Sequence, residues 1–491
     1  MRPESPTPFL APGVGAMDSR FSRLCLPMSI GLGLLLAVYL VIFSPGYLLS
    51  NEDLELLIFL QILTAALWRF QARFFPFLLV VFLGAGTDVP FQSGLISGRW
   101  MVLGAGAVGG LLICLRDRAR PVRTFHMVAS FCVLAALLSA TSPEYPTQAV
   151  HKALSLMLLL LYGSFGARLA VAGRREQFAS GLLLGCEGLV YLLAIAYFIF
   201  RHDVMGNPNS LGLVTGVVAL PVSLWGILVS DRDLVRRRRI FAFLLALLLL
   251  LSSYSRASIA SGAISCVLLC LVLRRYRLMM KGCVLVAIAA VLVASLAPPL
   301  AESSGSVSST FLYKGHEGAG LLDSRKSIWE KTVSTIHQHP WLGTGFGTLG
   351  TTFDNGERSG KFASSSAITR EHGNSYLAIV EGVGLLGGLP FMILILLVAM
   401  NAGRTLVRIR SGGDARSLAF PIALILLAGL VNAGFEDWLF AVGNYLCVFF
   451  WSLAFMLVDL VSLEQTHPSY SVARFAPMPR LDDLGAVPPA R

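Results

Sequence analysis

Polar side chains with catalytic potential precede an apolar segment in the C-terminal third of the chain. The stretch TREHGNSYLAIVEGVGLLGG, residues 369–388, opens with charged and polar residues and continues into an apolar sequence. A neutral histidine with a pKa near 6.5 can take a proton from a hydroxyl group. His372 is therefore a candidate base and Asn374 a candidate supporting residue, while a plain solvated histidine stays open as the alternative.

Arginines that could hold phosphate groups stand in three other regions. A guanidinium group binds phosphate oxygens in a bidentate manner and keeps its charge. The candidates are Arg201 in FRHDVMGNPNSLG, Arg256 in SSYSRASIASG and Arg325 in DSRKSIWEKT. An arginine at the end of an apolar segment can instead extend to the lipid headgroups, so both interpretations of Arg256 stay open.

Further polar residues complete the candidate set. Asn209 follows an Asn-Pro pair, which is equally typical of a turn with a helix cap. His337 and His339 flank a predicted helix end, where histidines can bind the last carbonyl groups. Glu436 lies in VNAGFEDWLF, beside a late apolar segment. The chemistry consistent with this set is displacement of a diphosphate by a hydroxyl, with arginines holding the diphosphate and a histidine accepting the proton.

The composition places these residues in a membrane protein. Of the 491 residues, 55% are hydrophobic and 14% charged, and the mean hydropathy is +0.71. Soluble domains are about 45–50% apolar and about 25% charged. Apolar runs long enough to cross a bilayer recur along the chain, which predicts an all-α, polytopic transmembrane helical bundle of about 12–14 spans. The candidate spans lie near residues 26–46, 54–69, 74–88, 98–115, 126–141, 150–172, 178–200, 210–229, 239–253, 256–273, 281–297, 376–400, 417–434 and 440–462.

Alternating charge orients these spans. Arginine clusters fall in every second connection, and the short connections between them are acidic or nearly neutral. Cytoplasmic loops of membrane proteins carry the excess of lysine and arginine. The pattern predicts a cytoplasmic N-terminus and places all the candidate site residues on the opposite, outer face. It also accounts for the net charge of +11 without nucleic acid as a partner.

The predicted organisation has five parts. Residues 1–24 form a cytoplasmic tail, and residues 25–297 contain spans 1–11. Residues 298–375 form one large loop with an amphipathic helix on the outer side, and residues 376–462 contain spans 12–14. Residues 463–491, with scattered prolines, form a disordered cytoplasmic tail.

The helix in the large loop has its own signals. Asp323 or Ser324 can cap its start, and Pro340 limits its end. Its apolar residues at helical spacing are Ile328, Trp329, Val333 and Ile336. We expect this amphipathic helix to lie on the outer surface of the membrane.

The sequence predicts neither a metal site nor a cofactor. The eight cysteines lie inside or beside apolar runs and form no Cys-x-x-Cys pair. This placement is typical of small packing residues and not of a disulfide or metal framework. No group of histidine, aspartate and glutamate shows the spacing of metal ligands.

The segment HGNSYLAIVEGVGLLGG resembles the signature of the O-antigen ligase and polymerase family. That signature has a histidine and an asparagine followed by nine residues and a Gly-x-x-Gly sequence. Here nine residues separate Asn374 from Gly384-Leu385-Leu386-Gly387. The family usually has histidine directly before the asparagine, whereas Gly373 stands between His372 and Asn374 in this chain.

Other segments resemble the same family over roughly residues 200–450. They are SYSRAS, the helix start from Arg325 to Trp329, HPWLGTGFG and the late Glu436. The resemblance implies a helical bundle of the GT-C type in the bacterial inner membrane, with an active site that faces the periplasm. It also implies metal-independent, inverting transfer of a glycan from undecaprenyl diphosphate to a hydroxyl of lipid A-core or of a growing glycan.

The resemblance also implies roles for the candidate residues. His372 would activate the acceptor hydroxyl, with His337 or His339 as alternatives. The residues implied to hold the diphosphate are Arg201, Arg256 and Arg325. The supporting residues are Asn209, Asn374 and Glu436.

Several functions stay open on the sequence. A ligase, a polymerase that extends the lipid-linked chain, and a protein O-glycosylation enzyme share the same donor chemistry. A transporter of lipid-linked glycans would instead place polar residues near the middle of its spans. Glu187 and Gln61 stand nearly alone at such positions, which favours the enzyme.

Overall fold

The protein is described here from a computed structural model. It describes residues 52–87, 92–117, 123–141, 146–199, 205, 207–296, 323–348 and 372–466. The predicted N-terminal tail, the first predicted span, Arg201 and most of the large loop lie outside the described residues, as does nearly all of the C-terminal tail. The elements within the described ranges are helices joined by connections, with no β-strand among them.

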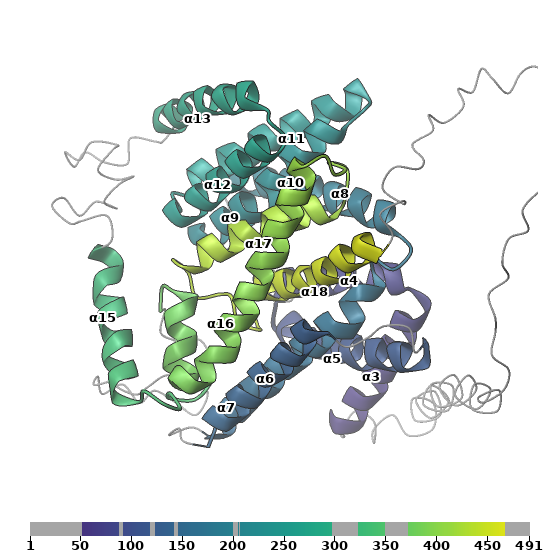
Figure 1. Ribbon diagram of the computed structural model, residues 1–491, viewed down its shortest axis with the longest axis vertical. Helices are drawn as coiled ribbons and strands as arrows, with labels where there is room; N and C mark the ends of the chain where they lie inside the picture. Colours follow the sequence, from purple (N-terminus) through teal and green to yellow (C-terminus); the bar gives the residue numbers. More distant parts are fainter. Residues whose placement is uncertain are drawn as a thin grey trace, which may run out of the picture.

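The first half of the described chain consists of helices and three short π-helical segments. They are α3 (Glu52–Arg69), α4 (Gln71–Ala85), α5 (Gln92–Asp117), α6 (Thr124–Ser139), α7 (Pro146–Leu161), η1 (Tyr162–Ala167), α8 (Arg175–Ala194), η2 (Ile195–Ile199), α9 (Pro208–Leu213), η3 (Val214–Ala219) and α10 (Leu220–Val229). Figure 1 shows α5, α6 and α7 in one part of the bundle and α8 to α13 in another.

The second half carries the longest helix. Its elements are α11 (Asp233–Ser252), α12 (Arg256–Val272), α13 (Tyr276–Leu296), α15 (Asp323–Gln338), α16 (Ser375–Arg410), α17 (Ala419–Ala433) and α18 (Tyr445–Thr466). The loop helix α15 lies at the edge of the bundle and packs against α16 (Figure 1).

Length and hydropathy make this a multi-pass membrane protein. Six helices of the described residues are long and apolar enough to cross a bilayer: Gln92–Leu115, Pro146–Ala167, Arg175–Ile199, Pro208–Val229, Ser375–Arg410 and Tyr445–Ser462. Five shorter apolar helices accompany them: Ile58–Leu67, Gln71–Ala85, Thr124–Ser139, Arg256–Val272 and Ala419–Ala433. The predicted all-α, polytopic bundle is confirmed, and the number of spans stays a prediction.

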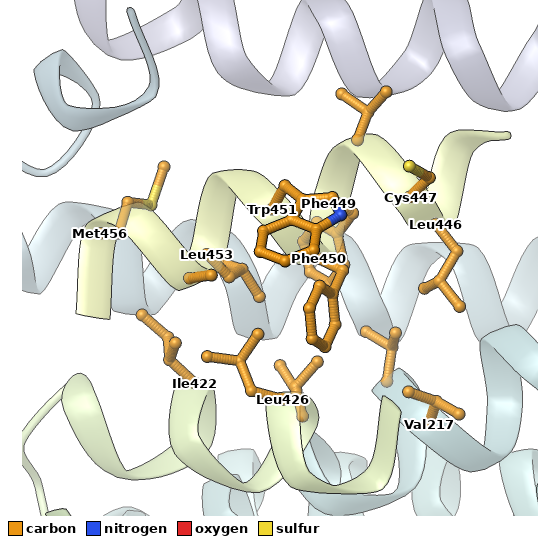
Figure 2. Packing of buried hydrophobic residues seen from close by; sticks show 14 of the residues in the cluster. Val217, Ile422, Leu426, Leu446, Cys447, Phe449, Phe450, Trp451, Leu453 and Met456 are labelled. Atoms are coloured by element: carbon orange, nitrogen blue, oxygen red, sulfur yellow. The ribbon is translucent and has the colours of Figure 1, made fainter. Parts of the chain in front are cut away.

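Helices α17 and α18 form the centre of the bundle. The aromatic side chains of Phe450 and Trp451 are almost completely buried, as is Leu426 on the facing helix. Figure 2 shows these residues interlocking between the two helices. Large apolar side chains on peripheral helices point outward instead, for example Leu192 and Ile199, which are 68% and 70% exposed. Outward-facing apolar surface of this kind fits contact with lipid.

Contacts between helix ends define the two ends of the bundle. At one end, the Asn432 side chain donates to Ser258 Oγ over 3.3 Å, and Tyr445 OH donates to the Ser210 carbonyl over 3.3 Å. The starts of α9, α12 and α18 therefore meet the end of α17, and we call this the His372 end. At the other end, Arg168 pairs with Asp459 near the end of α18; we call this the Asp459 end.

Candidate functional site

The candidate site is built around a break in α16. Gly384 has φ +70° and ψ −178°, so the helix is interrupted there and changes direction (Figure 1). A Cβ atom at this position would lie 2.2 Å from the Trp341 carbonyl oxygen. Only glycine therefore fits both the backbone conformation and the space. The Gly-x-x-Gly sequence thus shapes the short first part of α16, which follows His372.

The segment that follows α15 forms hydrogen bonds with the backbone at this break. The backbone N–H groups of Thr344 and Gly345 donate to the carbonyls of Glu381 and Gly382, each over 2.9 Å. The Leu385 N–H donates to the Pro340 carbonyl over 2.8 Å. A broken helix leaves backbone groups without partners, and here the sequence HPWLGTGFG supplies them. This loop therefore fixes where the first part of α16 lies.

His372 lies between two carboxylates. Its Nε2 is 3.3 Å from Glu381 Oε2, and its Nδ1 is 3.5 Å from Asp437 Oδ2. Its backbone N–H also donates to Asp437 Oδ2 over 2.9 Å. Glu381 comes from the first part of α16, and Asp437 comes from the connection between α17 and α18. The imidazole ring is therefore held from both sides, and Asp437 reaches it from 65 residues later in the chain.

These neighbours change the acidity of His372. Burial alone would lower its pKa, but the hydrogen bonds and negative charges of Asp437 and Glu381 outweigh burial and raise the pKa to about 9. The pKa of Asp437 is lowered: burial would raise it, and the hydrogen bonds and charge of His372 overcome that effect. The sequence interpretation assumed an ordinary histidine pKa near 6.5. The folded site instead holds a protonated imidazole at neutral pH.

Arg325 joins the loop helix to this cluster. Its Nη2 donates to Glu436 Oε1 over 2.7 Å, and its Nη1 donates to the Gly373 carbonyl over 2.9 Å. Trp329 Nε1 donates to the same carbonyl over 3.2 Å. The guanidinium group has five N–H donors, so these two bonds leave part of it available to a ligand. The side chains of Arg325 and Glu436 are 21% and 19% exposed, which gives solvent access to the pair.

Asn374 and Ser375 fix the start of α16. The Asn374 side chain caps the helix and accepts from the N–H groups of Tyr376 and Leu377 over 2.8 and 3.1 Å. Ser375 Oγ donates to the Glu436 carbonyl over 2.6 Å. Asparagine is a preferred cap because its side-chain oxygen satisfies backbone N–H groups at the helix start. Asn374 therefore positions His372 by fixing the start of α16 at Ser375, three residues after His372.

Arg256 and Asn209 lie at the same end of the bundle. Arg256 is the first residue of α12 and stands two residues before Ser258, which contacts Asn432 near the end of α17. Asn209 lies in the first turn of α9, where its N–H donates to the capping side chain of Asn207 over 2.9 Å. The structure thus places both residues at the His372 end.

The two alternative histidines lie apart from His372. His337 and His339 are exposed and stand at the far end of α15 from Arg325. Twelve residues of helix separate His337 from Arg325, roughly 18 Å. Within the described residues, His372 is thus the histidine that the fold joins to Arg325 and Glu436.

Two members of the cluster were not singled out as site residues from the sequence. Asp437 directly follows Glu436 in VNAGFEDWLF, but only Glu436 was named as a candidate. Glu381 was read as part of an apolar segment, although an acid there is unusual and it lies two turns after Asn374, on the same helix face. Its side chain is 1% exposed. In the described ranges, no group of three or more histidine, cysteine, aspartate or glutamate side chains could hold a metal ion.

Comparison with known proteins gives a family match for part of the chain. No curated protein matches the chain. Residues 241–392, however, match the family model described as O-antigen ligase. That range contains Arg256, Arg325, His372 and the break at Gly384. Residues 241–392 of this multi-pass membrane protein are therefore similar to the O-antigen ligase family of ligase- and polymerase-type membrane enzymes.

Proposed function

We propose that the protein is a metal-independent, inverting glycosyltransferase that uses a glycan linked to undecaprenyl diphosphate. The observation that carries this proposal is the position of His372, held between Glu381 and Asp437 at the start of a broken helix. A lipid-linked donor keeps its prenyl chain in the bilayer and its diphosphate at the membrane surface. Catalytic groups for such a donor belong at the mouth of the spans, facing the periplasm of the bacterial inner membrane.

In the proposed reaction, the acceptor hydroxyl attacks the anomeric carbon of the donor sugar. A new carbon–oxygen bond forms with inversion as the bond to the diphosphate breaks, and undecaprenyl diphosphate leaves with its charge. Arg256 and Arg325, together with Arg201, hold the diphosphate oxygens. The hydroxyl proton passes to His372, and the two carboxylates stabilise the imidazolium ion that results.

The raised pKa of His372 has a consequence for this step. With a pKa of about 9, roughly 1% of His372 is neutral at pH 7. The neutral form is the one that accepts a proton, so the reaction should accelerate as the pH rises toward 9. We assign Asp437 the role of a positioning residue, because it holds the backbone and ring of His372.

A ligase and a polymerase of this kind differ in the acceptor of the glycan. We favour lipid A-core as the acceptor, which makes the protein a ligase. The runner-up is a polymerase whose acceptor is the growing lipid-linked glycan, and protein O-glycosylation shares the same donor. In the proposed reaction, the site residues bind the glycan donor and accept the hydroxyl proton. Both steps are the same in all three functions.

Transfer by the purified protein tests the proposal. Wild type and His372→Ala are incubated with undecaprenyl-diphosphate glycan, with and without lipid A-core. We expect glycan on lipid A-core with wild type only, and a loss of about 10²- to 10⁴-fold in the variant. Longer chains on the prenyl carrier would identify a polymerase. Transfer that is unchanged in His372→Ala would contradict the role of this residue.

A further inference from the structure

Two basic side chains form a second cluster at the His372 end. Arg99 lies in α5, and its Nη1 donates to the Gly443 carbonyl over 2.9 Å, just before α18. Lys152 lies in α7, and its stem packs against Gly347, where an added Cβ would approach Lys152 Cγ to 3.0 Å. Helices α5 and α7 are in contact, and the Arg99 charge is close enough to act on the Lys152 ammonium group.

This cluster holds positive charge without a counterion in the described residues. Arg99 stacks on the Trp100 ring at 5.1 Å, and its buried Nε has no hydrogen-bond partner. Within the described ranges, Lys152 forms no hydrogen bond or ion pair, and no carboxylate pairs with Arg99. Both residues are half-buried. Two like charges withdrawn from water are unfavourable unless an anion offsets them.

The depth of the cluster indicates which anion could reach it. Arg99 is seven residues from the start of α5 and Lys152 six residues from the start of α7. These intervals correspond to roughly 9–11 Å of helix, the level between headgroups and hydrocarbon if the helices begin at the membrane surface. Lipid phosphates lie near this level. An arginine fork and a lysine point charge both bind phosphate oxygens.

We propose that Arg99 and Lys152 form a binding site for a phosphate or diphosphate group, between α5, α7 and the start of α18. It is separate from the His372 cluster, although the connection between α17 and α18 contacts both: Asp437 at one end of it holds His372, and Gly443 at the other end holds Arg99. The site takes a phosphate-class anion that is carried on a lipid or free in solution.

A thermal-shift titration of the full chain in neutral detergent tests this site. Inorganic pyrophosphate and phosphatidic acid are added separately, and the unfolding temperature is followed. A saturable rise is expected in wild type, because a ligand bound to the folded state stabilises it. Lys152→Met keeps the apolar stem and removes the charge, so its apparent affinity should fall at least tenfold. Arg404→Gln, which removes an exposed arginine elsewhere, should titrate like wild type.

The two probes separate the sources of the anion. A rise with pyrophosphate indicates a soluble anion, and a rise with phosphatidic acid alone indicates a lipid phosphate; either supports the site if Lys152→Met weakens it. Repeating the titration in Arg256→Gln separates this site from the proposed diphosphate ligands, and the shift should persist there. No saturable rise with either probe, or equal affinity in Lys152→Met, would overturn the proposal.

Stability without any anion gives a second, independent test. Because the two positive charges oppose each other, Lys152→Met should unfold at the same temperature as wild type or at a higher one. A clear drop would show that Lys152 has a stabilising partner, which contradicts the proposal. Both measurements report binding and stability, so their outcome is distinct from the success or failure of the glycan transfer assay.

Discussion

The two ends of the bundle use similar residues in different ways. At the Asp459 end, Arg168 is 6% exposed. Its Nε and Nη2 donate to the two oxygens of Asp459, and its Nη1 donates to the Ser164 carbonyl over 3.1 Å. His126 Nε2 lies 3.4 Å from the same Nη1. This cluster is closed, because the protein itself surrounds the guanidinium group.

At the His372 end, the charged groups are partly open. Arg325 uses one N–H group for Glu436 and another for Gly373, and its side chain remains 21% exposed. His372 stands beside a helix break and a connection that returns from α17. The comparison teaches that a buried arginine, histidine and acid do not by themselves indicate a site. Two features distinguish the candidate active site from a structural ion pair. Solvent reaches the Arg325 side chain, and the protein uses only some of its N–H donors.

Breaking the closed cluster should have the largest effect on stability. Arg168→Met leaves the Asp459 carboxylate buried without its partner, which should lower the free energy of unfolding by about 3–5 kcal/mol. Thermal unfolding in detergent measures this loss. The double variant Arg168→Met/Asp459→Leu removes both charges and should recover much of the stability. A single variant as stable as wild type would show that the pair is not structural.

Substitution of the glycine at the helix break should have the next largest effect on stability. Gly384→Ala places a Cβ against the Trp341 carbonyl at a positive φ, which should lower the free energy of unfolding by about 2–4 kcal/mol. Glycan transfer should fall as well, because the first part of α16 carries Glu381. Gly388→Ala is the matched control, since its Cβ would meet only the Val380 side chain at 3.5 Å. Equal behaviour of the two variants would contradict a special role for the break.

Removing the distant histidines should have the smallest effect. His337→Ala and His339→Ala change exposed side chains at the far end of α15, so transfer should stay within about twofold of wild type. The same glycan transfer assay measures this. A loss as large as that of His372→Ala would return the role of base to one of these residues.

The sequence predicted the helices well because apolar length and charge alternation are local signals. The candidate spans 126–141 and 417–434 correspond closely to α6 and α17. The face of the loop helix was predicted less well. Val333 was expected on its apolar face but is 39% exposed, whereas Thr332 is fully buried. Packing of α15 against α16, which the sequence does not reveal, decides that orientation.

Some residues of the candidate site could be singled out from the sequence. His372, Asn374, Arg325 and Glu436 could be singled out because their residue types and their positions beside spans are visible in the sequence. The pKa of His372 could not be predicted, because it depends on a connection 65 residues later that brings Asp437 to the ring. The break at Gly384 was equally hidden, since it depends on the loop that supplies its hydrogen bonds.

The pH dependence of transfer tests the central claim most directly, which is that His372, held between two carboxylates, is the base. Below its pKa of about 9, the wild-type rate should rise about tenfold per pH unit. In Asp437→Asn, one negative neighbour is lost, so the pKa of His372 should fall and the rise should occur at lower pH.

Stability must be followed in parallel, because the raised pKa also affects folding. The folded pKa lies above the unfolded value of 6.5, so the stabilising contribution of His372 is complete below pH 6.5 and is lost as the pH rises through 9. Unfolding temperatures at each pH separate this loss from the change in rate. A rate that rises toward pH 9 and shifts in Asp437→Asn is the predicted result. A rate that is flat between pH 6 and 9, or identical in both proteins, would contradict the account.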